Sequence, residues 1–119
     1  KNNNSVELSN KADNEFMEKL LKLIETNIDN PELNIQMMCS ELAMSRTLLY
    51  NKITQLTGKS PTEFIRIFRL KQAAALLLSG AYSVTDVAFK VGIDNPKYFS
   101  RIFKEFYGVS PKEYLAKRE

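Results

Sequence analysis

The sequence contains no histidine and no tryptophan, and it has a single cysteine. Histidine is the commonest general base and metal ligand, and one cysteine can form neither an internal disulfide nor a zinc site. We therefore predict no metal, no cofactor and no enzymatic activity. Cys39 falls in an apolar helical set with Ile35, Met38 and Leu42, so we expect a buried, unreactive thiol.

Long apolar runs are absent as well, because no stretch reaches 18 apolar residues. We therefore expect no membrane contact by this chain and a cytoplasmic location. The chain starts at Lys1 without a secretory pattern, so we expect a fragment of a longer protein, whose missing region could carry a membrane anchor. A helical domain of 119 residues is also not expected to hold a small-molecule ligand.

Strand patterns are missing too, since no apolar alternation extends beyond about four residues. The four glycines and three of the four prolines instead stand where helices would end or begin. We predict an all-α domain at 13–119 with about seven helices, after a flexible linker or tail at 1–12. The expected helices lie at about 14–28, 46–57, 61–79, 96–107 and 111–118, with short ones after Asn34 and Ser83.

The central helix, 61–79, has the clearest boundaries. Ser60 and Glu63 are spaced for a capping box around Pro61, and Ser79-Gly80 ends the run. At 1.5 Å per residue the helix would be about 28 Å long. Its apolar residues lie on more than one side, so we expect it to be buried on more than one side and to act as a rigid spacer.

An internal repeat flanks this helix. Gly58-Lys-Ser-Pro-Thr-Glu-Phe-Ile65 matches Gly108-Val-Ser-Pro-Lys-Glu-Tyr-Leu115, with four identities, 50 residues further on. The match extends back to apolar positions that we expect to point inward, which pair Leu49 with Phe99, Ile53 with Phe103 and Leu56 with Phe106. Each copy reads as a short helix, a tight turn and a second helix. That order predicts two helix-turn-helix units, at about 34–57 and 83–107.

The second helix of each copy keeps a polar face at corresponding positions. The faces consist of Thr47, Tyr50, Asn51 and Thr54 in the first copy and of Lys97, Ser100, Arg101 and Lys104 in the second. Residues 1–33 carry four Lys/Arg against seven Asp/Glu, a net charge of −3, whereas residues 34–119 carry 13 against seven, a net charge of +6. Matching faces on the basic part of the chain favour DNA over a merely solvated surface. An all-helical protein-interaction module is the alternative.

Residues 31–116 resemble the DNA-binding domain of the AraC/XylS family of bacterial transcription regulators. The resemblance lies in Glu41-Leu-Ala-Met-Ser-Arg, Thr57-Gly-Lys-Ser-Pro-Thr-Glu-Phe-Ile, Val84-Thr-Asp-Val-Ala-Phe-Lys-Val-Gly-Ile, Tyr98-Phe-Ser-Arg-Ile-Phe-Lys and Gly108-Val-Ser-Pro-Lys-Glu-Tyr. It implies seven helices and a long linker helix that holds two recognition helices in successive major grooves. The chain is also similar to output domains at the C-termini of hybrid two-component sensors.

The resemblance further implies the contacts with double-stranded DNA. Base contacts are expected at Arg46, Thr47, Tyr50, Asn51, Pro96, Lys97, Ser100 and Arg101, and phosphate contacts at Lys59, Arg66, Arg69, Lys71, Lys90, Lys104 and Lys112. Asn51 stands where many relatives carry Arg, so the first unit is expected either to read a different base or to bind more weakly. Leu48 replaces a polar residue, and we favour a core role over contact with a thymine methyl.

The expected partners are promoter DNA and, for the full-length regulator, RNA polymerase. We expect this fragment to be monomeric and the full-length protein to be capable of dimerising.

Overall fold

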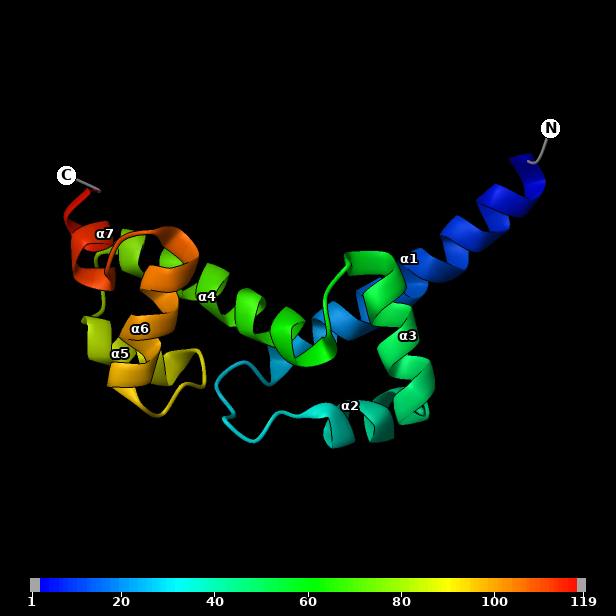
Figure 1. Ribbon diagram of the computed structural model, residues 1–119, viewed down its shortest axis with the longest axis horizontal. Helices are drawn as coiled ribbons and strands as arrows, with labels where there is room; N and C mark the ends of the chain where they lie inside the picture. Colours follow the sequence, from blue (N-terminus) through cyan, green and yellow to red (C-terminus); the bar gives the residue numbers. More distant parts are fainter. Residues whose placement is uncertain (1–2, 118–119) are drawn as a thin grey trace. The chain divides into compact units, whose positions relative to one another are not determined.

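The computed structural model describes residues 3–117, which form seven helices and no strand (Figure 1). The helices are α1 (Asn3–Thr26), α2 (Ile35–Leu42), α3 (Arg46–Thr57), α4 (Pro61–Ser79), α5 (Val84–Lys90), α6 (Pro96–Tyr107) and α7 (Pro111–Lys117). The predicted all-α class is therefore confirmed for this part of the chain. Lys1 and Asn2, in the expected tail, and Arg118 and Glu119 lie outside the described residues.

Side-chain caps begin most of these helices. An oxygen of each capping residue accepts a hydrogen bond from the backbone N–H three positions on, in the pairs Asn34–Met37, Ser45–Leu48, Ser83–Asp86 and Asn95–Tyr98. Such a cap is worth about 1 kcal/mol, because it satisfies an N–H that the helix leaves unpaired. Helix α7 begins with a full capping box, in which Ser110 and Glu113 exchange side-chain-to-backbone bonds of 2.8 and 3.1 Å.

Helix α1 differs from the prediction. It begins at Asn3 rather than Asn14 and ends at Thr26, so Asp13 lies inside the helix and is not its cap. The residues before Asp13 include neither proline nor glycine, and adding a turn to an existing helix costs far less than nucleating one. The packed turns around Phe16, Leu20 and Ile24 supply that nucleus, since these side chains are at most 6% exposed.

Residue contacts divide the chain into two compact units. Among the described residues, the first unit comprises 3–27 and 33–62, and the second comprises 28–32 and 63–117. In the first unit α1 packs against α2 and α2 packs against α3. Its described core includes the buried apolar side chains Phe16, Leu20, Ile24, Leu33, Met38, Leu49 and Ile53.

Helix α4 supplies the core of the second unit from Glu63 onward. Its buried Leu70, Ala73, Ala74 and Leu77 join Val87 and Ala88 of α5 and Phe99, Ile102 and Phe103 of α6 in one cluster. Ala73 and Ala74 are 0% and 5% exposed, so this part of the predicted spacer is also core. A helix breaker at Ala74 is therefore expected to unfold the second unit rather than to act on spacing alone.

An aromatic group extends this core to α7. Phe103 of α6 lies 4.7 Å from Tyr107 and 5.4 Å from Tyr114, measured between ring centroids. Burial, and then the neighbouring Tyr114, raise the pKa of Tyr107 above its ordinary value. Phe106 was expected to point inward but is 42% exposed, with its ring edge against Tyr107. It lies in the last turn of α6, where Tyr114 packs against Phe103 and Tyr107.

The turn between α2 and α3 contains a strained alanine. Ala43, which caps α2, has φ 54° and ψ 48° and is the only described non-glycine residue with positive φ. Counted from the caps Asn34 and Ser83, Gly92 is its counterpart in the second unit, with φ 80°. The left-handed conformation costs an L-residue roughly 1–2 kcal/mol relative to glycine.

We therefore expect Ala43→Gly to stabilise the first unit. Relief of backbone strain outweighs the greater freedom of glycine in the unfolded chain, so the net gain should be about 0.5–1 kcal/mol in a urea titration. Ala75→Gly, at an exposed position inside α4, is the matched control and should lose about 1 kcal/mol. Equal losses from both substitutions would show that Ala43 carries no strain.

Candidate nucleic-acid interface

Helix α3 separates a buried face from an exposed polar face. Leu49 and Ile53 are fully buried, and they anchor the helix in the first unit. The four predicted base-contacting residues of this helix, Arg46, Thr47, Tyr50 and Asn51, are all exposed. The cap at Ser45 fixes where the helix begins, and the buried pair fixes its rotation. Together they determine which side chains point outward.

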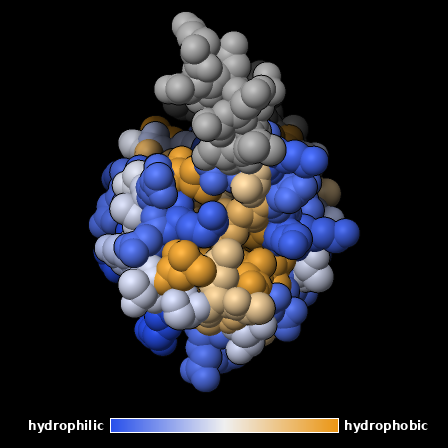
Figure 2. Space-filling view, turned by 90° about the vertical axis from the view of Figure 1, so that its right-hand side faces the viewer, coloured by the Kyte–Doolittle hydropathy of each residue, from blue (hydrophilic) through white to orange (hydrophobic). Residues whose placement is uncertain are grey.

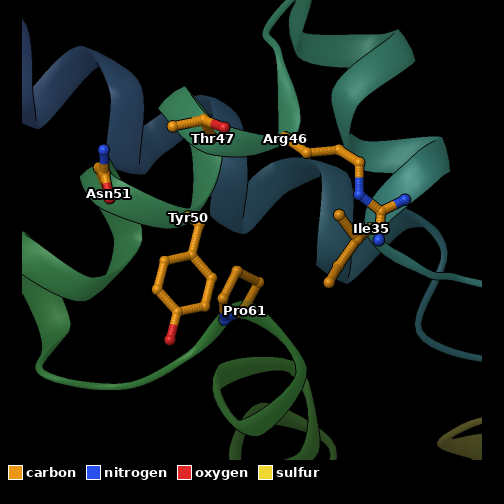
Figure 3. A pocket seen from close by; sticks show the side chains of 6 residues that line it. All are labelled: Ile35, Arg46, Thr47, Tyr50, Asn51 and Pro61. Carbon is orange, nitrogen blue, oxygen red and sulfur yellow. The ribbon is translucent and has the colours of Figure 1, made fainter.

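The same four residues line a shallow pocket of about 300 Å³ (Figure 3). Ile35, at the start of α2, and Pro61, at the start of α4, complete the lining. Figure 3 shows the Tyr50 ring beside Pro61 and the Arg46 guanidinium beside Ile35. The pocket therefore combines an apolar wall with a cation, a phenol, a hydroxyl and an amide, and all of these groups can contact DNA bases or the sugar–phosphate backbone.

Leu48 lies beside this face and is not part of the core. Its side chain is 48% exposed, because it lies about 100° around the helix from buried Leu49. Among the side chains of the first unit that the structure describes, the exposed large apolar residues are Leu21, Leu48 and Tyr50. On the face of the molecule shown in Figure 2, apolar side chains gather in the middle and hydrophilic ones surround them. The predicted core role of Leu48 was wrong, and contact with a thymine methyl is the alternative that remains.

Cys39 was likewise expected to be buried, but it is only partly buried. The side of α2 that turns into the core carries Met38, which is fully buried, and the next residue lies about 100° further around the helix.

Helix α6 repeats the division seen in α3. Phe99, Ile102 and Phe103 are at most 3% exposed and hold the helix in the second unit. The predicted contact residues Lys97 and Arg101 are exposed, as is Lys104, whereas Pro96 and Ser100 are partly buried. Asn95 caps the helix immediately before Pro96. The second unit thus presents three cationic side chains along one helix face.

An acid accompanies this basic face. Arg101 Nη1 donates a hydrogen bond to Glu105 Oε2 at 3.1 Å, and the two side chains are 61% and 63% exposed. Arg101 Cζ also lies 5.1 Å from the centroid of the Tyr98 ring. The guanidinium is therefore held on one edge by a carboxylate and on one face by an aromatic ring.

Arg69 is the one predicted phosphate contact that the structure contradicts. Arg69 is only 6% exposed. Its Nη1 donates hydrogen bonds to Ile28 O at 2.6 Å and to Val91 O, and its Nη2 donates one to Asn30 O at 2.9 Å. A side chain enclosed in this way cannot reach a phosphate. Arg69 instead ties the segment 28–32 and the α5–α6 turn to α4 within the second unit.

The same surroundings shift the pKa of Arg69. Burial lowers the pKa of the guanidinium, and the nearby carboxylate of Asp29 acts in the opposite direction. Arginine nevertheless stays protonated at neutral pH. The second unit therefore contains a buried cation, which is stabilised by backbone carbonyl dipoles and by the carboxylate of Asp29.

The remaining predicted phosphate contacts lie nearer the surface. Arg66, Lys71, Lys90, Lys104 and Lys112 are exposed and Lys59 is partly buried. Lys90 Nζ lies 4.6 Å from the ring centroid of Tyr82, so a phosphate contact would compete with a cation–π interaction. These six residues stay predictions, as do the eight base contacts.

Among residues 11–116, whose side chains the structure describes, no group of three or more His, Cys, Asp or Glu is placed to hold a metal ion. Among the helices of residues 3–117, none has the length and apolar character needed to cross a membrane.

Comparison with known proteins places this arrangement in a family. Residues 38–117, more than half of the chain, match the family described as a helix-turn-helix domain. The regulator MtrA of Neisseria gonorrhoeae is 38% identical over 98 residues, which cover 81% of this chain and 33% of MtrA. Histidine kinase P4 of Formosa agariphila is 36% identical over 102 residues, which cover 86% of this chain and 7% of the kinase. The chain thus spans a third or less of either relative.

Solved structures agree with these matches. The DNA-binding domain of AdpA, determined in complex with a target DNA, has a TM-score of 0.77 at 27% identity and covers 85% of this chain and 89% of its own. The C-terminal domain of AraT, a response regulator from Geobacillus stearothermophilus, has a TM-score of 0.75 at 31% identity and covers 81% and 79%. The chain belongs to the AraC/XylS family of helix-turn-helix transcription regulators.

Proposed function

We propose that this chain is a sequence-specific double-stranded DNA-binding module of a bacterial transcription regulator. The observation that carries the proposal is that the same helix arrangement occurs twice. Helices α3 and α6 are each capped at the N-terminus, held by a buried apolar face and exposed along a polar face at positions 50 residues apart. A second helix presented in this way is the element that enters a major groove in helix-turn-helix proteins. The likeness to the DNA-bound AdpA domain supports the same function.

The two faces predict different base preferences. Arg101 on α6 can donate two hydrogen bonds to guanine O6 and N7, whereas Asn51 on α3 suits adenine N6 and N7. Exposed Leu48 lies on the same helix as Asn51 and is suited to contact a thymine methyl. We therefore expect the first unit to prefer A·T pairs and the second unit to prefer a G·C pair.

We further propose that the two recognition helices occupy successive major grooves, one duplex turn of about 34 Å apart. Selection of bound sites from randomised duplexes tests this directly. Two conserved half-sites whose centres lie about 10 base pairs apart are expected. A single short site, or half-sites at variable spacing, would show that the units do not read DNA together.

Salt dependence tests whether the partner is DNA at all. Six phosphate contacts, the predicted set without Arg69, would give a slope of about −5 for log K against log salt concentration. Fluorescence anisotropy with a labelled duplex between 50 and 200 mM salt should therefore show a loss of affinity of roughly a thousandfold. No measurable duplex binding at the lowest salt would contradict the proposal and favour a protein-interaction module.

The relatives also suggest the setting in which this module works. The kinase from F. agariphila and the response regulator AraT support an output domain of a two-component system, whether in a hybrid sensor or in a separate regulator. In that setting the protein acts in the cytoplasm on promoter DNA and, in its full-length form, on RNA polymerase. We propose that this chain is monomeric and that dimerisation belongs to other regions of the regulator.

A further inference from the structure

A cluster on α6 is not explained by the repeat. Arg101 donates to Glu105 at 3.1 Å and lies over the ring of Tyr98, and all three side chains are exposed. An exposed ion pair four residues apart on a helix adds little to stability, because water and salt screen it. The cluster therefore has another consequence, which is that it restricts where the Arg101 guanidinium points.

The first unit lacks such a cluster. At the positions 50 residues earlier stand Leu48, Asn51 and Gln55, so the corresponding corner of α3 is uncharged. All three of these residues are exposed, as their counterparts are. An acid beside a base-reading position is thus a property of the second unit alone, and Gln55 offers a matched position without charge.

We propose that Glu105 is a positioning and specificity residue, which aims Arg101 at a guanine and weakens binding to duplexes that lack it. This inference rests on the proposed DNA-binding function. A guanidinium has five N–H donors, and the bond to Glu105 uses one of them, so others remain for guanine O6 and N7. Without Glu105, Arg101 is free to swing to any phosphate, a contact that carries no sequence information.

The charge of Glu105 acts in the same direction. A carboxylate on the DNA-facing helix is repelled by phosphates, so it weakens binding to every duplex. A cognate site offsets this repulsion, because the guanine engages the guanidinium that Glu105 holds. A non-cognate site offers no such compensation. Glu105 therefore lowers non-specific affinity more than specific affinity.

The test compares the wild-type chain with Glu105→Gln, Arg101→Ala and the double variant. Each is titrated by anisotropy against a duplex selected for tight binding, the same duplex with the Arg101-dependent guanine pair replaced, and a random-sequence duplex. We expect Glu105→Gln to raise affinity for the random duplex about threefold and to reduce discrimination between the first two duplexes by a similar factor. Arg101→Ala should reduce that discrimination by about tenfold or more.

The double variant separates positioning from direct reading. In the Arg101→Ala background, Glu105→Gln should leave discrimination unchanged, because there is no guanidinium left to aim. If Glu105→Gln still lowers discrimination there, Glu105 reads a base itself and the inference is wrong. If Glu105→Gln changes affinity for all duplexes by one factor, Glu105 is an ordinary surface charge and the inference is also wrong.

Controls separate the role of Glu105 from the proposed DNA-binding function on which it rests. Gln55→Ala, at the matched position of the first unit, should leave discrimination at the guanine pair unchanged. Circular dichroism melting curves should show that each variant is folded at the assay temperature. Sequence-specific binding by the wild-type chain with no response to Glu105→Gln would overturn the inference alone. Absence of duplex binding by the wild-type chain would overturn the proposed function and the inference with it.

Discussion

Replacing Arg69 by Met is expected to lower the free energy of unfolding of the second unit by about 3 kcal/mol. The substitution removes a guanidinium that donates to the carbonyls of Ile28, Asn30 and Val91. Methionine fills much of the space but has no donor, so these carbonyls lose their partner. A buried carbonyl left without a hydrogen bond costs about 1–3 kcal/mol, and partial access of water to Ile28 and Asn30 reduces the sum.

Arg66→Met on the same helix is the matched control. Arg66 is exposed, so its replacement should change stability by no more than about 0.5 kcal/mol. Urea unfolding followed by tyrosine fluorescence reports mainly on the second unit, because Tyr82, Tyr98, Tyr107 and Tyr114 belong to it and only Tyr50 belongs to the first.

DNA binding by the same variants separates the two roles considered for Arg69. A phosphate contact would appear as a weaker salt dependence with unchanged stability. The buried role predicts the reverse: a lower urea midpoint, and near-normal affinity at temperatures where the variant is folded. Arg69→Lys should fall between wild type and Met, since an ammonium donates hydrogen bonds but lacks the planar fork that reaches three carbonyls at once.

Replacing Gly92 by Ala should be at least as damaging. Gly92 has φ 80°, and a Cβ at this position would overlap Arg69 Nη1 and the Ile28 carbonyl oxygen and lie 2.9 Å from Arg69 Cζ. The backbone strain costs roughly 1–2 kcal/mol, and displacement of the guanidinium adds an overpacking cost of about 1–3 kcal/mol. We therefore expect a loss of about 3–4 kcal/mol in the urea experiment.

Gly108→Ala isolates the contribution of backbone strain. Gly108 has φ 81°, nearly the same backbone strain, but no atom lies within 4 Å of a Cβ built there. Its replacement should cost only about 1–2 kcal/mol. Equal losses for the two glycines would show that Arg69 does not approach Gly92 closely in solution.

A double substitution connects the two predictions. In the Arg69→Met background, Gly92→Ala should cost less than it does alone, because part of the overlap has been removed. Residues that share a contact are expected to be non-additive in this way. Additive losses would mean that Arg69 and Gly92 contribute to stability independently.

These contacts also explain the difference between the two turns of the repeat. Ala43 takes the left-handed conformation that Gly92 takes in the second unit, at the cost of backbone strain. Gly92 lies against Arg69 and the Ile28 carbonyl, and this approach leaves no room for a methyl group. Backbone conformation favours glycine at both turns, but close packing requires it only at the second.

Most helix boundaries, and the outward faces of α3 and α6, could be predicted from the chain alone because they depend on short-range interactions. A cap such as Ser45 bonds to an N–H three residues away, and Gly58 and Gly108 end their helices with left-handed backbones. The outward faces of α3 and α6 follow in turn from the helical period of their buried residues. Because the repeat places the polar face at corresponding positions of both helices, each copy supports the prediction made for the other.

Burial at particular positions required contacts between distant segments. The residues around Phe106 do not show that its side chain stays exposed, and those around Asp13 do not show that α1 begins at Asn3. The prediction for Arg69 was wrong because long basic side chains usually lie at the surface. The position of Arg69 in the helical repeat nevertheless indicated burial. Ile65, Arg69, Ala73 and Leu77 follow one another every four residues, and all are at most 6% exposed.

That stripe shows that Arg69 turns inward, but not which groups receive its charge. Its acceptors lie 22, 39 and 41 residues away in sequence, and they meet only when the segment 28–32 and the α5–α6 turn close over α4. A buried cation is stable only with such partners. Local hydrogen bonds and helical period therefore specify the elements and the faces they present, whereas the pairing of remote backbone carbonyls decides whether this arginine serves DNA or the core.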